Sequence, residues 1–126
     1  SCQSVGQLPV DVRSIGCDFA CGTGRKWLRG PRGTGFLYAR LDTMRRTGGV
    51  PDVQPARTAL VGEPPMIDHS GAMWTSPYTY ELLPDARRFE MWECSEALRH
   101  GLAAAVHLAI ATDPRAISAR ANALAQ

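Results

Sequence analysis

A glycine-rich, basic stretch decides the fold of this chain, and it reads Gly22-Thr23-Gly24-Arg25-Lys26-Trp27-Leu28-Arg29-Gly30-Pro31-Arg32-Gly33-Thr34-Gly35. Five of its fourteen residues are glycine, and four are arginine or lysine. Glycine allows tight turns and lets backbone amides converge on an anion. Hydroxyl groups and positive charge complete what a phosphate monoester needs, so we expect a tight phosphate-binding loop here.

Lys26, the only lysine in the chain, lies inside this loop. A lysine amine is the nucleophile that an aldehyde requires. A Walker-type nucleotide loop needs serine or threonine after its lysine, whereas Trp27 follows here. The dinucleotide fingerprint GxGxxG also fails, because the glycine spacing runs in the opposite order. The residues alone leave open whether the loop binds phosphate or is a connector with solvated charges.

The segments around the loop predict alternating short helices and strands. Asp11 suits the N-cap of a helical turn over Val12 to Ile15. Cys17 to Cys21 is expected to be a short buried strand, and Thr34 to Arg40 is expected to be a second strand because it contains aromatic and apolar β-formers. Residues 47 to 84 show no helical period and predict a long excursion with short strands that covers a site.

Two helices are expected toward the end of the sequence. From Ser95, apolar residues recur at three- and four-residue intervals, which is typical of one buried helical face. These residues are Leu98, Leu102, Ala105, Val106 and Ala109. Asp113 followed by Pro114 predicts the start of the second helix, since aspartate suits an N-cap and proline the first helical position.

Composition limits the classes of function. The chain has 126 residues, of which 44% are hydrophobic and 21% charged, as in one ordinary globular domain. The formal net charge is only +2, so a nucleic-acid partner is not expected. The longest apolar stretch, near Leu102 to Ala111, is too short to span a membrane, and no signal peptide is evident. We therefore expect a cytoplasmic protein with reduced thiols.

No metal site is expected, because the four cysteines form no CxxC pair and have no histidines at ligand spacing. Cys94 is expected to be an ordinary small buried residue. His69 is expected to be an exposed loop histidine. Arg87 and Arg88 suit either an anion site or an extended charged edge that leads into the following helix.

Four segments closely resemble the aminotransferase class V family: Gln3 to Gln7, Gly16 to Phe19, Gly24 to Tyr38 and Ala86 to Glu90. Cysteine desulfurases, selenocysteine lyases, isopenicillin N epimerase-like proteins and the carbon-sulfur lyases of ergothioneine synthesis share this framework. The resemblance implies an α/β fold, namely the C-terminal part of the large, mostly parallel-sheet domain of fold type I pyridoxal phosphate-dependent transferases. Residues 1–112 would be part of this cofactor-binding domain. Residues 113–126 would begin the helix that leads to a C-terminal small domain.

The resemblance also implies roles for individual residues. Lys26 would form the internal aldimine with pyridoxal phosphate and then move the substrate's Cα proton as acid and base. Gln3 would hydrogen-bond the cofactor's phenolic oxygen. Thr23 and Arg25 would bind the phosphate by hydroxyl and by charge, although many members have histidine where Arg25 stands.

Two departures from the family pattern qualify these expectations. The aspartate that pairs with the pyridinium nitrogen would fall one residue ahead of Ser1, so we expect a fragment. Trp92-Glu93 stands where several desulfurases have a Gly-Thr pair whose threonine reaches the partner subunit's phosphate.

The implied function is that of a homodimeric enzyme acting on an amino-acid substrate, with carbon-sulfur cleavage favoured over transamination. The alternative is an inactive fragment or remnant with a basic phosphate- or nucleic-acid-binding loop.

Overall fold

The computed structural model describes residues 1–46 and 62–126, which divide into two compact units. The first unit comprises Ser1–Leu37 together with Ser95–Gln126, and the second comprises Tyr38–Cys94. The described residues form both helices and strands, with the strands in two two-stranded sheets. None of the described helices combines the length and the apolarity that crossing a membrane takes.

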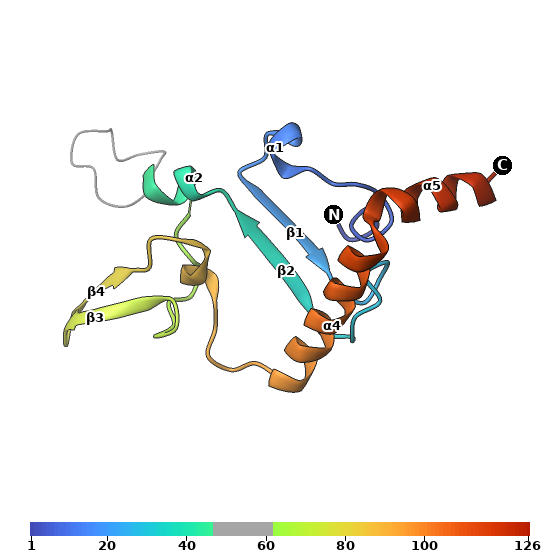
Figure 1. Ribbon diagram of the computed structural model, residues 1–126. Coiled ribbons are helices and arrows are strands. Elements are labelled where there is room, and N and C mark those ends of the chain that lie inside the picture. Colours follow the sequence, from blue (N-terminus) through green and yellow to red (C-terminus); the bar gives the residue numbers. More distant parts are fainter. Residues whose placement is uncertain (47–61) are drawn as a thin grey trace. The chain divides into compact units, whose positions relative to one another are not determined.

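The first unit contains a strand pair, one short helix and two longer helices that follow one another (Figure 1). Its elements are α1 (Val12–Ile15), β1 (Phe19–Thr23), the start of β2 (Gly35–Ala39), α4 (Glu96–Thr112) and α5 (Pro114–Leu124). The arrows of β1 and β2 run in opposite directions in Figure 1. The glycine-rich loop therefore connects two neighbouring antiparallel strands.

Three helices of this unit begin where the sequence predicts, because each starts at a capping side chain. The Asp11 carboxylate accepts hydrogen bonds from the Arg13 and Ser14 N–H groups at 2.9 and 3.3 Å. The Asp113 carboxylate accepts one from the Arg115 N–H at 2.9 Å. The Ser95 hydroxyl caps α4 in the same way.

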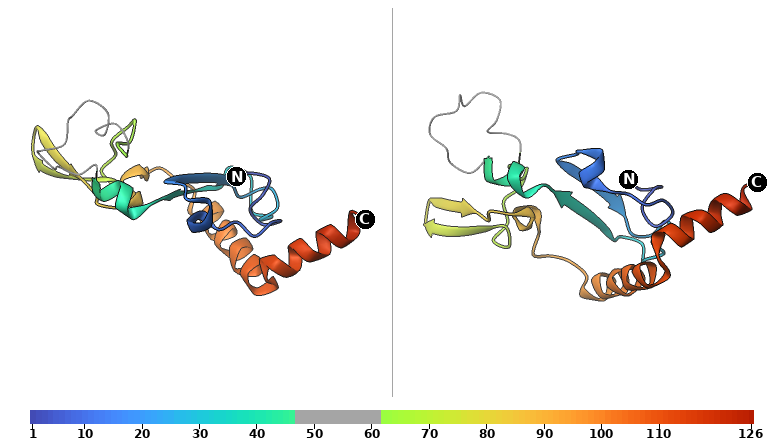
Figure 2. Two further views of the ribbon diagram at one scale, coloured as in Figure 1. Left: turned by 90° about the horizontal axis from the view of Figure 1, so that it is seen from above. Right: turned by 45° about the horizontal axis from the view of Figure 1, so that its top comes forward.

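Asp113 also sets the direction of α5. Its φ of 65° is left-handed, which is uncommon for a residue with a side chain. The chain therefore turns between the two helices, and Figure 2 shows α5 leaving α4 at an angle from both directions of view.

The first strand differs from its prediction in place and in burial. β1 spans Phe19–Thr23 rather than Cys17 to Cys21. Gly16 ends α1 in a left-handed conformation, and the Cys17 thiol lies 3.8 Å from the Val12 carbonyl oxygen, so the chain becomes extended only afterwards. The expectation of a buried strand is wrong, since its residues are exposed or half-buried. This pattern is typical of a sheet with one covered face.

The second unit is built around a hairpin. It contains α2 (Leu41–Arg46), β3 (Ala72–Ser76), β4 (Thr79–Leu82) and the 3-10 helix η1 (Ala86–Phe89). β3 and β4 pair antiparallel with Trp74 opposite Tyr80, and the two rings meet edge to face at 6.1 Å. The predicted short strands of the excursion are confirmed here. Residues 47–61 of the excursion lie outside the described residues.

Arg88 occupies the interior of the second unit, with 3% of its surface exposed. Its Nε donates to the Leu83 carbonyl at 2.8 Å, and its Nη1 donates to the Gly62 carbonyl at 3.0 Å. Its Nη2 donates to the carbonyl of Met44, which is fully buried, at 3.4 Å. The interpretation of Arg88 as part of an extended charged edge is therefore wrong. The residue lies in η1 and ties three segments together.

Gly6 provides a stability prediction with a matched control. Gly6 has a φ of 91°, and a Cβ atom there would lie 2.5 Å from the Trp27 carbonyl carbon. Gly16 has a φ of 75° but no neighbour within 4 Å of that position. Alanine at Gly16 should therefore cost only the left-handed backbone, about 1 kcal/mol. Alanine at Gly6 also forces two backbone segments apart, so a loss of roughly 3 kcal/mol or more is expected. Urea unfolding of both variants measures the difference, and equal losses would contradict the close approach at Gly6.

Candidate functional site: the lysine turn

The site is the turn that follows β1, residues 24–30, which we call the lysine turn. Its ends are joined by a hydrogen bond from the Gly30 N–H to the Gly24 carbonyl at 2.8 Å. Inside it, the Arg29 N–H donates to the Lys26 carbonyl, also at 2.8 Å. The Gly24 N–H donates to the Thr34 carbonyl at 2.8 Å, which extends the β1–β2 pairing to the base of the turn. Lys26 is thus presented from a closed turn.

Helix α4 packs against this turn through glycines. A Cβ atom at Gly24 would meet the Thr34 side chain and would lie 2.6 Å from Leu102 Cδ1. At Gly30 the same Leu102 atom would be 3.0 Å away. On the helix side, a Cβ atom at Gly101 would lie 2.7 Å from Pro31 Cγ. Helix and turn approach this closely only because these glycines have no side chains.

The segment that contains Gln3 lies along the other side of the turn. The Ser1 nitrogen donates to the Cys21 carbonyl in β1 at 2.8 Å, and Gly6 touches the backbone of Trp27 and Leu28. Gln3 itself is exposed, in a turn between these two anchors. Among the described residues no hydrogen bond joins its side chain to Lys26, so the structure brings their segments together but not the two groups.

Thr23 is the last residue of β1, and Arg25 and Lys26 follow it after Gly24. The Thr23 hydroxyl donates to the Thr34 carbonyl at 3.3 Å, so it already has one partner. Lys26 is half-buried and Arg25 is exposed.

The positive charge of the lysine turn is not neutralised within the described part of the chain. Arg25, Lys26, Arg29 and Arg32 have no carboxylate partner among the described residues. No acidic residue occurs in the sequence between Asp18 and Asp42. Unpaired cations on a closed, glycine-rich turn form an arrangement that can bind an anion.

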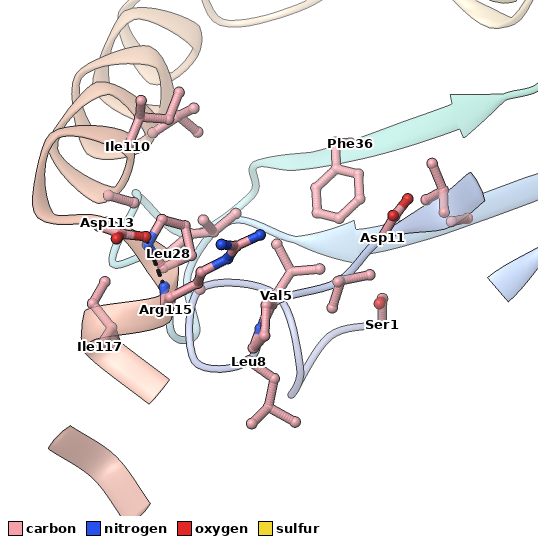
Figure 3. Close-up of a pocket in the computed structure, with 18 residues that line it drawn as sticks. Ser1, Val5, Leu8, Asp11, Leu28, Phe36, Ile110, Asp113, Arg115 and Ile117 are labelled. Carbon is pink, nitrogen blue, oxygen red and sulfur yellow. Dashed lines mark hydrogen bonds between the residues drawn. The ribbon is translucent and has the colours of Figure 1, made fainter. Parts of the chain in front are cut away.

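A cavity of about 450 Å³ in the first unit touches the lysine turn only through Leu28 (Figure 3). Figure 3 shows apolar side chains around it, among them Leu8, Leu28, Phe36, Ile110 and Ile117. Two lining carboxylates, those of Asp11 and Asp113, are engaged in capping α1 and α5. None of the four predicted site residues lines this cavity. We therefore place the candidate chemistry at the lysine turn, where the reactive groups are.

A second cluster joins Asp68, His69 and Trp92 in the second unit. The His69 and Trp92 rings lie 4.9 Å apart, and His69 Nδ1 is 3.4 Å from the Asp68 carboxylate. The Ser70 N–H donates to the same carboxylate at 2.8 Å. This hydrogen bond is the main reason why the pKa of Asp68 lies below its ordinary value, with further contributions from the Trp92 N–H and His69. His69 is exposed, as predicted.

The prediction that Cys94 is a buried residue is wrong, because its side chain is exposed. It directly precedes Ser95, the N-cap of α4, and so lies outside the apolar stripe of that helix. The sequence also gave no sign that Arg29 adopts a left-handed backbone, with a φ of 61°. No residue-type signal at this position could have revealed it, since arginine is not a typical left-handed residue.

Comparison with known structures defines the class of fold. Over 90% of its length, the chain superposes on an apo cysteine desulfurase from Thermococcus onnurineus NA1, with a TM-score of 0.69 and 26% sequence identity. The match covers 25% of that desulfurase. The predicted fold class, α/β and part of a fold type I pyridoxal phosphate enzyme, is thereby confirmed.

Sequence comparison then gives the family. The family model for aminotransferase class V matches residues 1–72, more than half of the chain and including the lysine turn. The chain belongs to the aminotransferase class V family.

Two curated relatives agree with this assignment. A probable cysteine desulfurase of Methanothermobacter thermautotrophicus is 58% identical over 40 residues, which are 32% of this chain and 10% of that protein. An isopenicillin N epimerase of Streptomyces clavuligerus is 37% identical over 60 residues, 48% of this chain and 14% of that protein. The chain thus spans a small part of the length of these relatives.

The contact between α4 and the lysine turn can be tested with two identical substitutions. Leu102→Ala removes the side chain that touches Gly24 and Gly30, so we expect a loss of about 2 kcal/mol in the free energy of unfolding. Leu108 lies in the same helix and is 55% exposed, and its replacement by alanine should cost less than about 0.5 kcal/mol. Chemical unfolding measures both values. Similar losses in the two variants would show that Leu102 contributes no more to the free energy of unfolding than an exposed leucine of the same helix.

The Asp68 cluster predicts a pH dependence. The folded-state pKa of Asp68 is lowered from 3.8, so its contribution to stability is present above that value and is lost as the pH falls below it. Asp68→Asn should therefore be less stable than the unchanged chain at pH 7, and the gap should narrow toward pH 3. Urea midpoints at the two pH values measure this gap. A gap that stays constant would contradict the assignment.

Proposed function

We propose that this chain carries the cofactor-binding lysine of a pyridoxal phosphate-dependent enzyme that acts on an amino acid, and that the lysine is Lys26. Carbon-sulfur bond cleavage of the cysteine desulfurase type is the proposed reaction, in line with the names of several relatives. The observation that carries the proposal is the position of the chain's single lysine on a closed turn with unpaired arginines, within the segment that matches the family.

The residues of the turn fit the chemical groups of this cofactor. Its phosphate needs positive charge and hydrogen-bond donors. Arg25 supplies the charge, and the Thr23 hydroxyl would donate to the phosphate once it releases the Thr34 carbonyl. Its aldehyde needs an amine, and Lys26 is the only lysine available. Gln3 is the proposed donor to the phenolic oxygen, and its segment is anchored beside the turn through Gly6.

The bound cofactor supplies an electron sink that stabilises negative charge on the substrate's Cα atom. Lys26 would hold the cofactor through its amine, and with an amino-acid substrate bound the same amine would move the proton at Cα. Thr23 and Arg25 would hold the phosphate. Thr23 ends β1 and Arg25 and Lys26 lie on the adjoining turn, and this proximity supports their joint use.

The proposal extends to the organisation of the enzyme. Residues 1–112 belong to the large, cofactor-binding domain, and residues 113–126 begin the helix that leads to a small domain. The enzyme acts as a cytoplasmic homodimer. The alternative function, an inactive remnant with a basic loop that binds phosphate or nucleic acid, rests on the same unpaired cations and differs in making no use of the Lys26 amine.

Borohydride reduction in the presence of pyridoxal phosphate separates the two functions. We expect a stable adduct on Lys26, identified by peptide mass analysis, and no such adduct in Lys26→Ala. Pyridoxine phosphate, which carries the phosphate but no aldehyde, serves as the control and should leave Lys26 unmodified.

The alternative makes the opposite predictions. A nucleic-acid-binding loop would bind oligonucleotides with a steep salt dependence that survives Lys26→Ala, because the arginines remain. Absence of the Lys26 adduct in the full chain at saturating pyridoxal phosphate would reject the enzymatic proposal.

A further inference from the structure

Arg29 is held in an unfavourable backbone conformation inside the lysine turn. Its φ of 61° lies in the left-handed region, where the Cβ atom of an L-residue crowds the following carbonyl group. Glycine adopts this conformation without that penalty, and the surrounding segment uses glycine freely. A strained residue that retains a long charged side chain next to a candidate catalytic lysine points to a role for that side chain.

The backbone hydrogen bond of Arg29 does not explain why an arginine occupies this position. The Arg29 N–H closes the turn on the Lys26 carbonyl at 2.8 Å, but any residue with an N–H group, glycine included, makes that bond. Asp113, the other left-handed residue with a side chain among the described residues, provides the contrast. Its carboxylate caps α5 by accepting the Arg115 N–H at 2.9 Å, so its side chain has an evident structural use.

No structural use of this kind accounts for the Arg29 side chain. It is exposed, and within the described ranges it forms neither an ion pair nor a hydrogen bond. Arg25, Lys26 and Arg32 lie within four residues of it along the chain and repel it. A doubly charged anion bound at the turn would relieve this repulsion, and a guanidinium group binds phosphate oxygens through two parallel hydrogen bonds.

We propose that Arg29 is a phosphate ligand of the lysine turn, acting beside Thr23 and Arg25. The inference rests on the proposed function, because it takes the phosphate monoester to be that of pyridoxal phosphate. It adds a residue that neither the turn's sequence pattern nor the family resemblance assigns to the cofactor. The strain at Arg29 is the cost of placing a guanidinium group where glycine would fit better.

Three substitutions test the side chain separately from the backbone. Arg29→Gly and Arg29→Asn remove the charge and suit the left-handed conformation, so they should unfold at the same temperature as the unchanged chain or a higher one. Arg29→Lys keeps the charge without the paired hydrogen bonds. Arg120→Gln, on the exposed surface of α5, removes one charge elsewhere and is the matched control.

Binding of pyridoxal phosphate is compared with binding of pyridoxal, which has the aldehyde but no phosphate. In the full chain we expect Arg29→Gly and Arg29→Asn to weaken pyridoxal phosphate about tenfold and to leave pyridoxal unchanged. Arg29→Lys should recover part of the affinity, and Arg120→Gln should behave like the unchanged chain. Inorganic phosphate should also raise the unfolding temperature of the unchanged chain more than that of Arg29→Gly.

Other results would overturn the inference. Equal affinity of Arg29→Gly and the unchanged chain for pyridoxal phosphate would show that the side chain does not bind phosphate. Arg29→Gly could instead lose affinity equally for pyridoxal and pyridoxal phosphate, or unfold at a lower temperature. Either result would show that Arg29 maintains the shape of the turn and does not bind phosphate. Failure of the proposed function is recognised separately, by the absence of a Lys26 adduct in the unchanged chain. In that case, the shift in unfolding temperature with inorganic phosphate decides whether Arg29 binds phosphate.

Discussion

The close approach of α4 to the lysine turn is the contact on which the geometry of the site depends. Leu102 packs so closely over Gly24 and Gly30 that a Cβ atom on these glycines would lie 2.6 and 3.0 Å from its Cδ1 atom. Because the turn has few internal side chains, its own two hydrogen bonds would leave it mobile in water. The helix adds an apolar contact at the base of the turn, where Gly24 is buried. A segment this rich in glycine thus obtains a defined conformation from packing against the helix.

The N-terminal segment restrains the same turn from another side. Gly6 lies against the backbone of Trp27 and Leu28, and Leu28 is buried. The lysine turn therefore contacts both a helix and an N-terminal turn, and these are about 95 residues apart in the sequence. Long-range contacts of this kind tie the presentation of Lys26 to the folding of the whole first unit.

Short-range signals in the sequence were sufficient to predict where the helices of the first unit begin. Asp11, Ser95 and Asp113 each act on amides within three residues, so their helices start where predicted. The limits of β1 were missed because they depend on Gly16 and Cys17, which extend the end of α1. Whether a strand begins immediately after a helix cap is decided by three-dimensional contacts that no local propensity encodes.

Long-range contacts account for the unexpected burial of Arg88. Its sequence context suggests a surface charge, yet the carbonyl groups of Met44 and Gly62, far along the chain, and of nearby Leu83 solvate it inside the second unit. A buried guanidinium group is tolerated when its donors are satisfied, and that condition is invisible in the sequence. The cationic character of the lysine turn, in contrast, follows from the sequence alone, because Lys26 and its neighbours Arg25 and Arg29 are charged whatever their conformation.

The cationic side chains of the lysine turn need a rigid backbone if they are to bind an anion selectively. Each cation alone attracts an anion weakly in water, since solvent and salt screen it within about 10 Å. Several cations bind one phosphate strongly only if they converge without a large loss of conformational freedom on binding. The contacts of Leu102 and Gly6 supply this preorganisation, and the left-handed residue Arg29 closes the turn on the carbonyl of Lys26. Under the proposed function, packing around glycine and anion binding are therefore coupled: a change that loosens α4 should weaken phosphate affinity even though it removes no charge.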